Sequence, residues 1–481
     1  MLRIFNTLNN KKEKFTPIKS NIVNMYVCGI TPYDFCHLGH GRTFIFFDIV
    51  VRFLRKSGYQ VNYIRNITNI DDKIIQKSKE YNLPVDIITN NFIKEMRKDF
   101  SLLNMLIPTQ EPLVTDHMES IFKMIQSLLA TNYAYHSKNG DIFFSVNKDS
   151  NYGKLSNQVL KKLKKTKISI NKNSKKHVED FVLWKKSKQN EPYWISPWGK
   201  GRPGWHIECS AINDFYFGNT IDIHGGGIDL LFPHHENENA QSTCYNQSSM
   251  YSKYWMHSGM VFLKQQKMSK SGKNCVYLRD ILKKNNPESI RLFFLSTHYK
   301  KPIYYDKNSS LRVSFFSLSK LYVALQQQNI FCFTNDKFKQ IKIYGLSYKK
   351  KFFHAMNDDF NTPKALSILF ELSKKIQMYK KKKSYCYSNY LSYILKKLGN
   401  VLGILFQNTS DFFSTNSVIK NEKYKRFIKT LIKKRNYFRI LKKWKKADFI
   451  KEKLLKLNIR VEDSEKKTTW KYINTFNNDS I

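Results

Sequence analysis

The feature that most constrains the fold is a strand–helix–strand unit near the N-terminus. Residues 22–28 are typical of a strand, and a stretch bearing glycine and proline, Gly29 to Pro32, follows it. A helix is expected to begin near His37, because apolar residues from Phe44 to Leu54 recur at helical spacing. A second strand at 61–68 completes a βαβ unit. The sequence therefore predicts an α/β fold with a doubly wound, Rossmann-type parallel sheet.

The rest of the chain divides by its patterning into further parts. Residues 1–310 are expected to form the α/β domain, with an insertion at about 110–200 that ends in a lysine-rich loop, Lys161 to Lys176. Helical periodicity dominates from 311 to 406 and predicts a helical bundle domain. After a linker rich in Asn, Ser and Thr, residues 421–481 are expected to form a small basic domain.

Charge limits the kind of partner. The chain carries 82 Lys and Arg residues against 38 Asp and Glu residues, a net charge of +44, which indicates a polyanionic partner such as a nucleic acid. Excess Lys, Asn, Ile, Tyr and Phe is also typical of A+T-rich coding, so both origins of the charge stay open. The most apolar run, 44–51, is too short for a membrane span and contains Asp48. Residues 1–15 have no apolar signal core, so we expect a cytoplasmic protein without membrane attachment.

Two short motifs indicate nucleotide chemistry. His37-Leu38-Gly39-His40 stands where the first helix should begin, so backbone N–H groups and the positive end of the helix dipole are available to phosphate oxygens. Lys267-Met268-Ser269-Lys270-Ser271 places two lysines in a small, hydroxyl-bearing loop that is suited to clamping departing phosphates. Their order and their separation of about 230 residues are more specific than either motif alone.

A second constellation is suited to a metal ion. His234 and Glu238 are four residues apart in a helix expected to start at Pro233, so their side chains would project from one face. Cys28 ends the first strand, and Cys209 lies far from it in the sequence. Two thiolates, an imidazole and a carboxylate suit tetrahedral zinc. Spacing alone does not choose His234 over His235 or Glu238 over Glu236.

Several longer segments together resemble the cysteinyl-tRNA synthetase family of class I aminoacyl-tRNA synthetases. The matching stretches are 26–34, 41–43, 65–73, 204–210, 224–230 and 358–363, in addition to the two nucleotide motifs. One departure is Asn69, where the family commonly has aspartate; it loses a charge and keeps an acceptor oxygen. The resemblance runs nearly end to end. It implies adenylate formation from Mg-ATP, transfer to tRNA-Cys, and a monomeric enzyme.

The resemblance also implies residue roles. One zinc ion would be held by Cys28, Cys209, His234 and Glu238. The cysteine pocket would contain Thr68, Trp205 and Asp229, with Asp229 holding the ammonium group. ATP would contact His37, His40, Gly226, Gly227 and Lys270, and catalysis would depend on His37, His40, Lys267 and Lys270. In the C-terminal domain, which would bind the anticodon, Arg439, Trp444, Asp448 and Asp463 would contact bases.

A zinc ion would distinguish cysteine from serine better than the shape of a pocket can. Cysteine and serine are near-isosteres, and an apolar pocket separates such substrates by only about 10–200-fold. A soft zinc ion with an open coordination position favours a thiolate strongly over a hydroxyl. Two other functions would account for parts of this sequence. A mycothiol-pathway cysteine ligase would lack the basic C-terminal domain, and a non-catalytic zinc protein that binds RNA would not need the intact nucleotide motifs.

Overall fold

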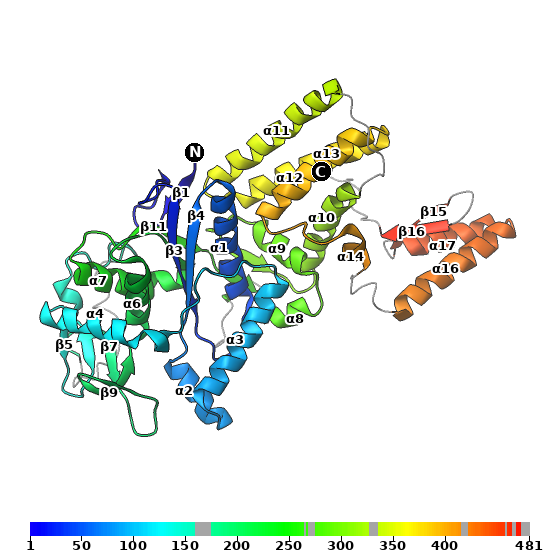
Figure 1. Ribbon diagram of the computed structural model, residues 1–481. Helices are drawn as coiled ribbons and strands as arrows, with labels where there is room; N and C mark the ends of the chain where they lie inside the picture. Colours follow the sequence, from blue (N-terminus) through cyan, green and yellow to red (C-terminus); the bar gives the residue numbers. More distant parts are fainter. Residues whose placement is uncertain are drawn as a thin grey trace.

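A four-stranded parallel sheet forms the centre of the computed structural model, which describes residues 1–158, 175–263, 266–267, 275–326, 335–414, 422–456, 459–463 and 468–472 (Figure 1). The strand order is β11–β10–β3–β4. The bounds are β3 (Ile22–Ile30), β4 (Gln60–Ile67), β10 (Ile221–Gly227) and β11 (Ser252–Ser258). Because every neighbouring pair is parallel, all four carboxyl ends lie at one edge.

Helix α1 (Leu38–Lys56) crosses from β3 to β4 and confirms the predicted βαβ unit. Its apolar face is buried, with Phe47, Val51 and Leu54 fully enclosed. The close approach of α1 to β10 depends on Gly225, where a Cβ atom would lie 2.2 Å from Cζ of Phe47. The helix therefore starts at the carboxyl edge of the sheet, where parallel α/β folds bind ligands.

Between β4 and β10 the chain first forms α2 (Asp72–Tyr81) and α3 (Val85–Leu102), and Ile93, Met96 and Phe100 of α3 pack in the core around α1. It then forms a lobe beside this edge, with α4 (Met118–Ala130), α6 (Trp205–Phe217) and an antiparallel sheet of order β5–β6–β7–β9–β8. Those strands are β5 (Ala134–His136), β6 (Ile142–Phe144), β7 (Phe181–Lys186), β8 (Trp194–Ser196) and β9 (Gly199–Pro203). Its apolar core includes Cys28 and Ile64 of the central sheet, so the lobe packs directly on β3 and β4. Most of the predicted Lys161–Lys176 loop lies outside the described residues.

Smaller elements flank the central sheet. An N-terminal hairpin is formed by β1 (Arg3–Asn6) and β2 (Lys11–Lys14), and α7 (Glu236–Asn246) follows β10. A three-stranded sheet consists of β12 (Val261–Leu263), β13 (Gln266–Lys267) and β14 (Ile303–Tyr305). Helices α8 (Leu278–Leu282) and α9 (Pro287–Leu295) precede β14.

The second half is helical, as predicted. A bundle is built from α10 (Ser310–Leu325), α11 (Asn335–Asn357), α12 (Thr362–Lys381) and α13 (Tyr385–Val401), followed by α14 (Thr409–Ser414). Helix α13 ends before Gly403, which adopts a φ of +70° in a turn that Arg291 fills. In the described ranges, no helix is both long and apolar enough to cross a bilayer.

The last part of the chain lies to one side of the bundle in Figure 1. It pairs α16 (Glu422–Ile440) and α17 (Trp444–Lys456) with the antiparallel hairpin β15 (Ile459–Asp463) and β16 (Thr468–Tyr472). Its apolar core is small, with Ile428, Leu431, Ile432, Ile450 and Leu454 buried together. A core of that size provides modest stability.

Candidate active site and metal-ligand cluster

The four residues expected to bind zinc meet at the carboxyl edge of the central sheet. Cys28 lies near the end of β3 and Cys209 in α6, while His234 and Glu238 flank the start of α7. The two sulfur atoms are 3.8 Å apart, and Nε2 of His234 lies 3.5 Å from Sγ of Cys28 and 3.7 Å from Sγ of Cys209. Oε1 of Glu238 lies 2.8 Å from that Nε2 and 3.1 Å from Sγ of Cys28. All four side chains are buried.

These separations fit one small ion. Zinc–sulfur bonds of about 2.3 Å at tetrahedral angles place two sulfur atoms about 3.8 Å apart, as found for Cys28 and Cys209. The two sulfur–nitrogen distances agree similarly, whereas the distances to Glu238 are somewhat shorter than a tetrahedron requires. A disulfide is excluded, since its sulfur atoms lie about 2.05 Å apart. The donor set and its spacing therefore fit zinc.

The local backbone agrees with the predicted helix start at Pro233. Within the π-helical turn Leu231–His235 only Phe232 is extended (φ −138°, ψ 131°), and helical backbone continues through His235 into α7, which begins at Glu236. His234 and Glu238 therefore lie one helical turn apart, as expected, and Nε2 of His234 is 2.8 Å from Oε1 of Glu238.

The pKa shifts divide charge unequally among the four ligands. Burial alone would lower the pKa of His234, but the Glu238 carboxylate raises it to about 10. Burial would likewise raise the pKa of Glu238, yet His224 and His234 hold it well below its usual range. Burial raises the pKa of Cys28, whereas a hydrogen bond from Cys28 lowers the pKa of Cys209 to about 6. At neutral pH Cys209 and Glu238 thus favour the forms that bind metal ions, and metal binding must displace the protons of Cys28 and His234.

A ring of further side chains orients these ligands. Nδ1 of His234 lies 2.9 Å from Nδ1 of His206, and Oε2 of Glu238 lies 2.8 Å from Nε2 of His224. Such outer partners fix the tautomer and orientation of metal ligands. Sequence reasoning did not assign a role to His206 or His224. Both lie inside segments that carry the family resemblance, but a single histidine in such a segment has no spacing that distinguishes a ligand's partner.

A second set of donors overlaps the first. Cys28, His224, His235 and Glu238 also offer ligand atoms within 4.8 Å of one another. This set shares Cys28 and Glu238 with the first and lacks its second thiol. His235 instead pairs through Nδ1 with Nε2 of His257 at 2.8 Å. Of the two histidines that spacing left open, His234 is the one beside both thiols.

Of the residues expected around the cysteine substrate, Trp205 lies beside a cluster ligand. The Trp205 ring is 4.2 Å from the His234 ring and partly exposed. Thr68 follows β4 and is buried, with Oγ1 donating to Oε2 of Glu208 at 3.1 Å. Asp229 lies in a short 3-10 turn directly after β10 and is exposed. At Gly226, a Cβ atom would lie 2.8 Å from Cε1 of His235, so a larger residue would not fit.

The first nucleotide motif forms an unusual helix cap. His37 is the N-cap of α1, and its Nδ1 accepts hydrogen bonds from the backbone N–H groups of Gly39 (3.1 Å) and His40 (3.4 Å). Nδ1 of His40 accepts from the backbone N–H of His37 at 3.3 Å, and the two rings stack 3.7 Å apart. Because both Nδ1 atoms are acceptors, each neutral ring carries its hydrogen on Nε2, a suitable donor to phosphate.

The second motif is joined to the first through the backbone. Residues 276–278, which follow the lysine loop, pair with 36–38: the N–H of Leu38 donates to the Val276 carbonyl (3.1 Å), and that of Leu278 to the Cys36 carbonyl (2.8 Å). Lys267 lies in β13, whereas Lys270 lies outside the described residues. The segment that follows the loop is therefore held beside the start of the helix that His37 caps.

The residues expected to contact the anticodon lie together in the C-terminal part. Arg435 makes a bidentate pair with Asp463 at 3.1 and 2.8 Å, and Arg439 also pairs with Asp463. Trp444, at the start of α17, is more than half exposed, and Asp448 is exposed one turn later. Arg439 and Asp463 thus bind each other in the absence of RNA, and Trp444 has the exposed ring that base stacking needs.

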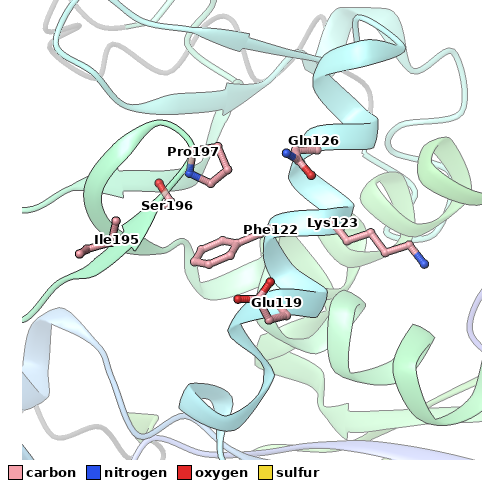
Figure 2. Close-up of a pocket in the computed structure, with 7 residues that line it drawn as sticks. All are labelled: Glu119, Phe122, Lys123, Gln126, Ile195, Ser196 and Pro197. Atoms are coloured by element: carbon pink, nitrogen blue, oxygen red, sulfur yellow. The ribbon is translucent and has the colours of Figure 1, made fainter.

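Two cavities away from the cluster offer no comparable chemistry. One, of about 350 Å³, lies between α4 and the turn after β8, lined by Glu119, Phe122, Lys123, Gln126, Ile195, Ser196 and Pro197 (Figure 2). The other, of about 400 Å³, lies between the end of α3, the turn before α9 and Phe406. Neither cavity includes a residue of the ligand cluster or of the two nucleotide motifs.

Comparison with known proteins agrees with this arrangement. Residues 14–314 match the family model of the class I (C) tRNA synthetase catalytic domain, and residues 351–407 match the DALR domain. Among solved structures, a Mycobacterium tuberculosis methionyl-tRNA synthetase bound by methionyl-adenylate aligns with a TM-score of 0.57 at 12% identity. That alignment covers 79% of this chain and 90% of that one. The fold and the matched domains are those of a class I aminoacyl-tRNA synthetase.

Curated relatives narrow the class further. A cysteine–tRNA ligase of Buchnera aphidicola (subsp. Acyrthosiphon pisum, strain Tuc7) is 51% identical, covering 98% of this chain and 99% of the relative. Those of Wigglesworthia glossinidia brevipalpis and Pasteurella multocida are 47% and 46% identical, again covering 98% of this chain and nearly all of each relative. The chain belongs to the cysteine–tRNA ligase family.

Proposed function

We propose that this protein activates cysteine with Mg-ATP and transfers it to the 3′ end of tRNA-Cys, with one zinc ion held by Cys28, Cys209, His234 and Glu238. The observation that carries the zinc assignment is the buried cluster, whose sulfur–sulfur and sulfur–nitrogen distances fit a tetrahedral ion. When bound, zinc supplies a soft Lewis acid that favours a thiolate over a hydroxyl. The side chains and backbone of the protein hold and orient ATP, cysteine and tRNA.

The first step joins cysteine to AMP. The cysteine carboxylate attacks the α-phosphorus of ATP, a new P–O bond forms, and the bond to pyrophosphate breaks. Hydrogen bonds from Nε2–H of His37 and His40, at the start of α1, would stabilise phosphate oxygens as charge moves onto the leaving group. Lys267 and Lys270 would add positive charge from the loop that is anchored beside them. No side chain forms a covalent intermediate.

The second step moves the cysteinyl group to RNA. The terminal ribose hydroxyl, the 2′-hydroxyl of a class I enzyme, attacks the acyl carbon and releases AMP. Asp229 would hold the substrate ammonium, while Gly226 and Gly227 would lie against the adenosine. At the other end of the molecule, Arg439, Trp444, Asp448 and Asp463 would contact the anticodon, with the exposed Trp444 ring stacking on a base. We propose a cytoplasmic monomer with domains at 1–310, 311–406 and 421–481.

Three measurements test the proposal. Purified protein should catalyse ATP–pyrophosphate exchange that depends on cysteine, and serine should support little of it. It should also charge tRNA-Cys, with charging lost when the anticodon is replaced. Metal analysis should find one zinc ion per chain. Exchange that does not respond to cysteine would refute the activity, and full cysteine selectivity in zinc-free protein would refute the metal's role.

A further inference from the structure

A buried chain of polar groups joins the two sides of the cysteine pocket. The backbone N–H of Gly29 donates to Oδ1 of Asn66 at 2.8 Å, and Nδ2 of Asn66 donates to Oγ1 of Thr68 at 3.3 Å. Oγ1 of Thr68 donates in turn to Oε2 of Glu208 at 3.1 Å. Asn66, Thr68 and Glu208 are each at least 97% buried. Neighbouring polar groups are buried this completely only when they form hydrogen bonds with one another.

The ends of this chain are adjacent to the two thiols. Gly29 follows Cys28 at the end of β3, and Glu208 precedes Cys209 in α6. Glu208 also lies three residues after Trp205, so the two side chains are neighbours on one face of the helix. The position of Gly29 is fixed by its surroundings, since a Cβ atom there would lie 1.6 Å from the Asn66 carbonyl oxygen. The hydrogen bonds therefore link the two residues that neighbour Cys28 and Cys209 in the sequence.

A count of hydrogens determines what Thr68 can recognise. A threonine hydroxyl has one hydrogen and two lone pairs. Its hydrogen goes to Glu208, and one lone pair accepts from Asn66. One lone pair remains, so Thr68 acts toward a ligand as an acceptor as long as Oε2 of Glu208 accepts its hydrogen. The ammonium group of the amino acid is a donor, whereas its carboxylate is an acceptor that this hydroxyl would repel.

We propose that Glu208 is a positioning residue for amino-acid recognition: by taking the Thr68 hydrogen, it turns the Thr68 oxygen into an acceptor for the substrate ammonium group. This inference rests on the proposed function, in which Thr68 lines the cysteine pocket. Glu208 itself does not contact substrate. It acts through Thr68, and the two residues should behave as one unit.

The variants Glu208→Leu and Glu208→Gln test this role. Leucine fills the space without an acceptor, so the Thr68 hydroxyl loses its fixed orientation. The KM for cysteine in pyrophosphate exchange should rise about tenfold, the size of a lost charge-assisted hydrogen bond. The KM for ATP and kcat should stay near wild type. Glutamine keeps an acceptor oxygen and should restore the cysteine KM to within about twofold. A general structural role would not give this pattern.

Two small thiols distinguish the contribution of the ammonium group to binding from that of the rest of the substrate. Cysteamine keeps the thiol and ammonium but lacks the carboxylate, whereas 3-mercaptopropionate lacks the ammonium. As inhibitors of exchange, cysteamine should bind about tenfold more weakly to Glu208→Leu than to wild type, and 3-mercaptopropionate equally well to both. Equal weakening of both compounds, or of neither, would overturn the proposal. Should Glu208→Leu fail to fold, Thr68→Val is judged by the same pair of compounds.

Coupling and controls complete the design. Because Glu208 acts through Thr68, adding Glu208→Leu to Thr68→Val should raise the cysteine KM no further, and additive effects would contradict the inference.

Two controls accompany these variants. The zinc content of each variant must equal that of wild type, so that the effect is not loss of metal through Cys209. Glu288→Gln is a matched control: this buried carboxylate accepts from the backbone N–H groups of Leu405 and Phe406, far along the chain from the pocket. It should lower thermal stability without changing the cysteine KM. Wild-type protein without cysteine-dependent exchange would refute the proposed function itself, a result distinct from active wild type with an unaffected Glu208→Leu.

Discussion

Asp463→Asn should reduce tRNA charging without reducing cysteine activation. Asp463 accepts two hydrogen bonds from Arg435, at 3.1 and 2.8 Å, and another from Oγ1 of Thr468 at 2.9 Å. It also pairs with Arg439. Arg435 is 5% exposed, whereas the Asp463 side chain is 31% exposed. The substitution keeps the shape of the side chain and removes the charge that neutralises the buried guanidinium.

The size of the effect follows from this partial burial. Removing one partner of a fully buried ion pair costs about 3–5 kcal/mol, and of an exposed pair about 0–1 kcal/mol. Asp463 lies between these limits, so we expect a loss of about 2 kcal/mol. The apolar core of this part, formed around Ile428 and Leu454, is small, and domains of this size have only about 3–5 kcal/mol of stability. The variant should therefore weaken the C-terminal part and leave the catalytic part intact.

Acid should act in the same direction on the wild type. Hydrogen bonds from Arg435 hold the pKa of Asp463 well below its usual range. A carboxylate with a lowered pKa in the folded state stabilises the fold above its unfolded pKa of about 3.9, and this contribution is lost as the pH falls below that value. The C-terminal part of the wild type should thus unfold more readily below about pH 4, as measured by its rate of proteolysis. The same change in pH should alter the proteolysis rate of Asp463→Asn less.

The assay compares charging of tRNA-Cys with cysteine-dependent pyrophosphate exchange. For Asp463→Asn, charging should fall at least tenfold at neutral pH, and exchange should stay within about twofold of wild type. Equal losses in the two assays would show that the substitution unfolds the catalytic part as well. Unchanged charging would show that Asp463 neither supports this part nor contacts the anticodon.

Two further substitutions test the cysteine-activation step and tRNA binding. Lys270→Ala should lower kcat and kcat/KM for exchange together, by at least tenfold, because its charge is proposed to act on the transition state; an unchanged exchange rate would remove Lys270 from the mechanism. Arg439→Ala should weaken tRNA charging and spare exchange, and higher salt should weaken tRNA binding further through counterion release, as measured by filter binding. If exchange fell as far as charging, Arg439 would have a structural role instead.

Local sequence patterns predicted much of the fold. The alternation of strand, glycine-bearing turn and amphipathic helix located β3, α1 and β4 to within two residues, because each pattern reflects burial on one face. The same approach placed a helix start at Pro233, and helical backbone begins there, directly after the extended Phe232. The π-helical form of this first turn was not predicted, because no local propensity specifies it.

The site was harder to predict than the fold. Cys28 and Cys209 are 181 positions apart, and only the pairing of β3 with β10 and the packing of α6 bring their sulfur atoms to 3.8 Å. Spacing could not choose between His234 and His235, and the family resemblance was needed to name the former. The partners of the ligands, His206 and His224, and the chain through Glu208 depend on side-chain directions that no sequence period specifies.

The central claim is that the metal at this cluster selects cysteine, and Cys209→Ser tests it most directly. A serine hydroxyl is nearly isosteric with the thiol but is a poorer ligand for zinc, so the fold should survive while zinc affinity falls. The measurement is the ratio of kcat/KM for cysteine to that for serine in pyrophosphate exchange, with zinc content determined on the same sample. We predict that zinc is lost, that cysteine activation falls steeply and serine activation changes less, and that the ratio drops toward the roughly 10–200-fold that a pocket can achieve by shape alone. A variant that has lost its zinc and keeps the full wild-type ratio would contradict the account.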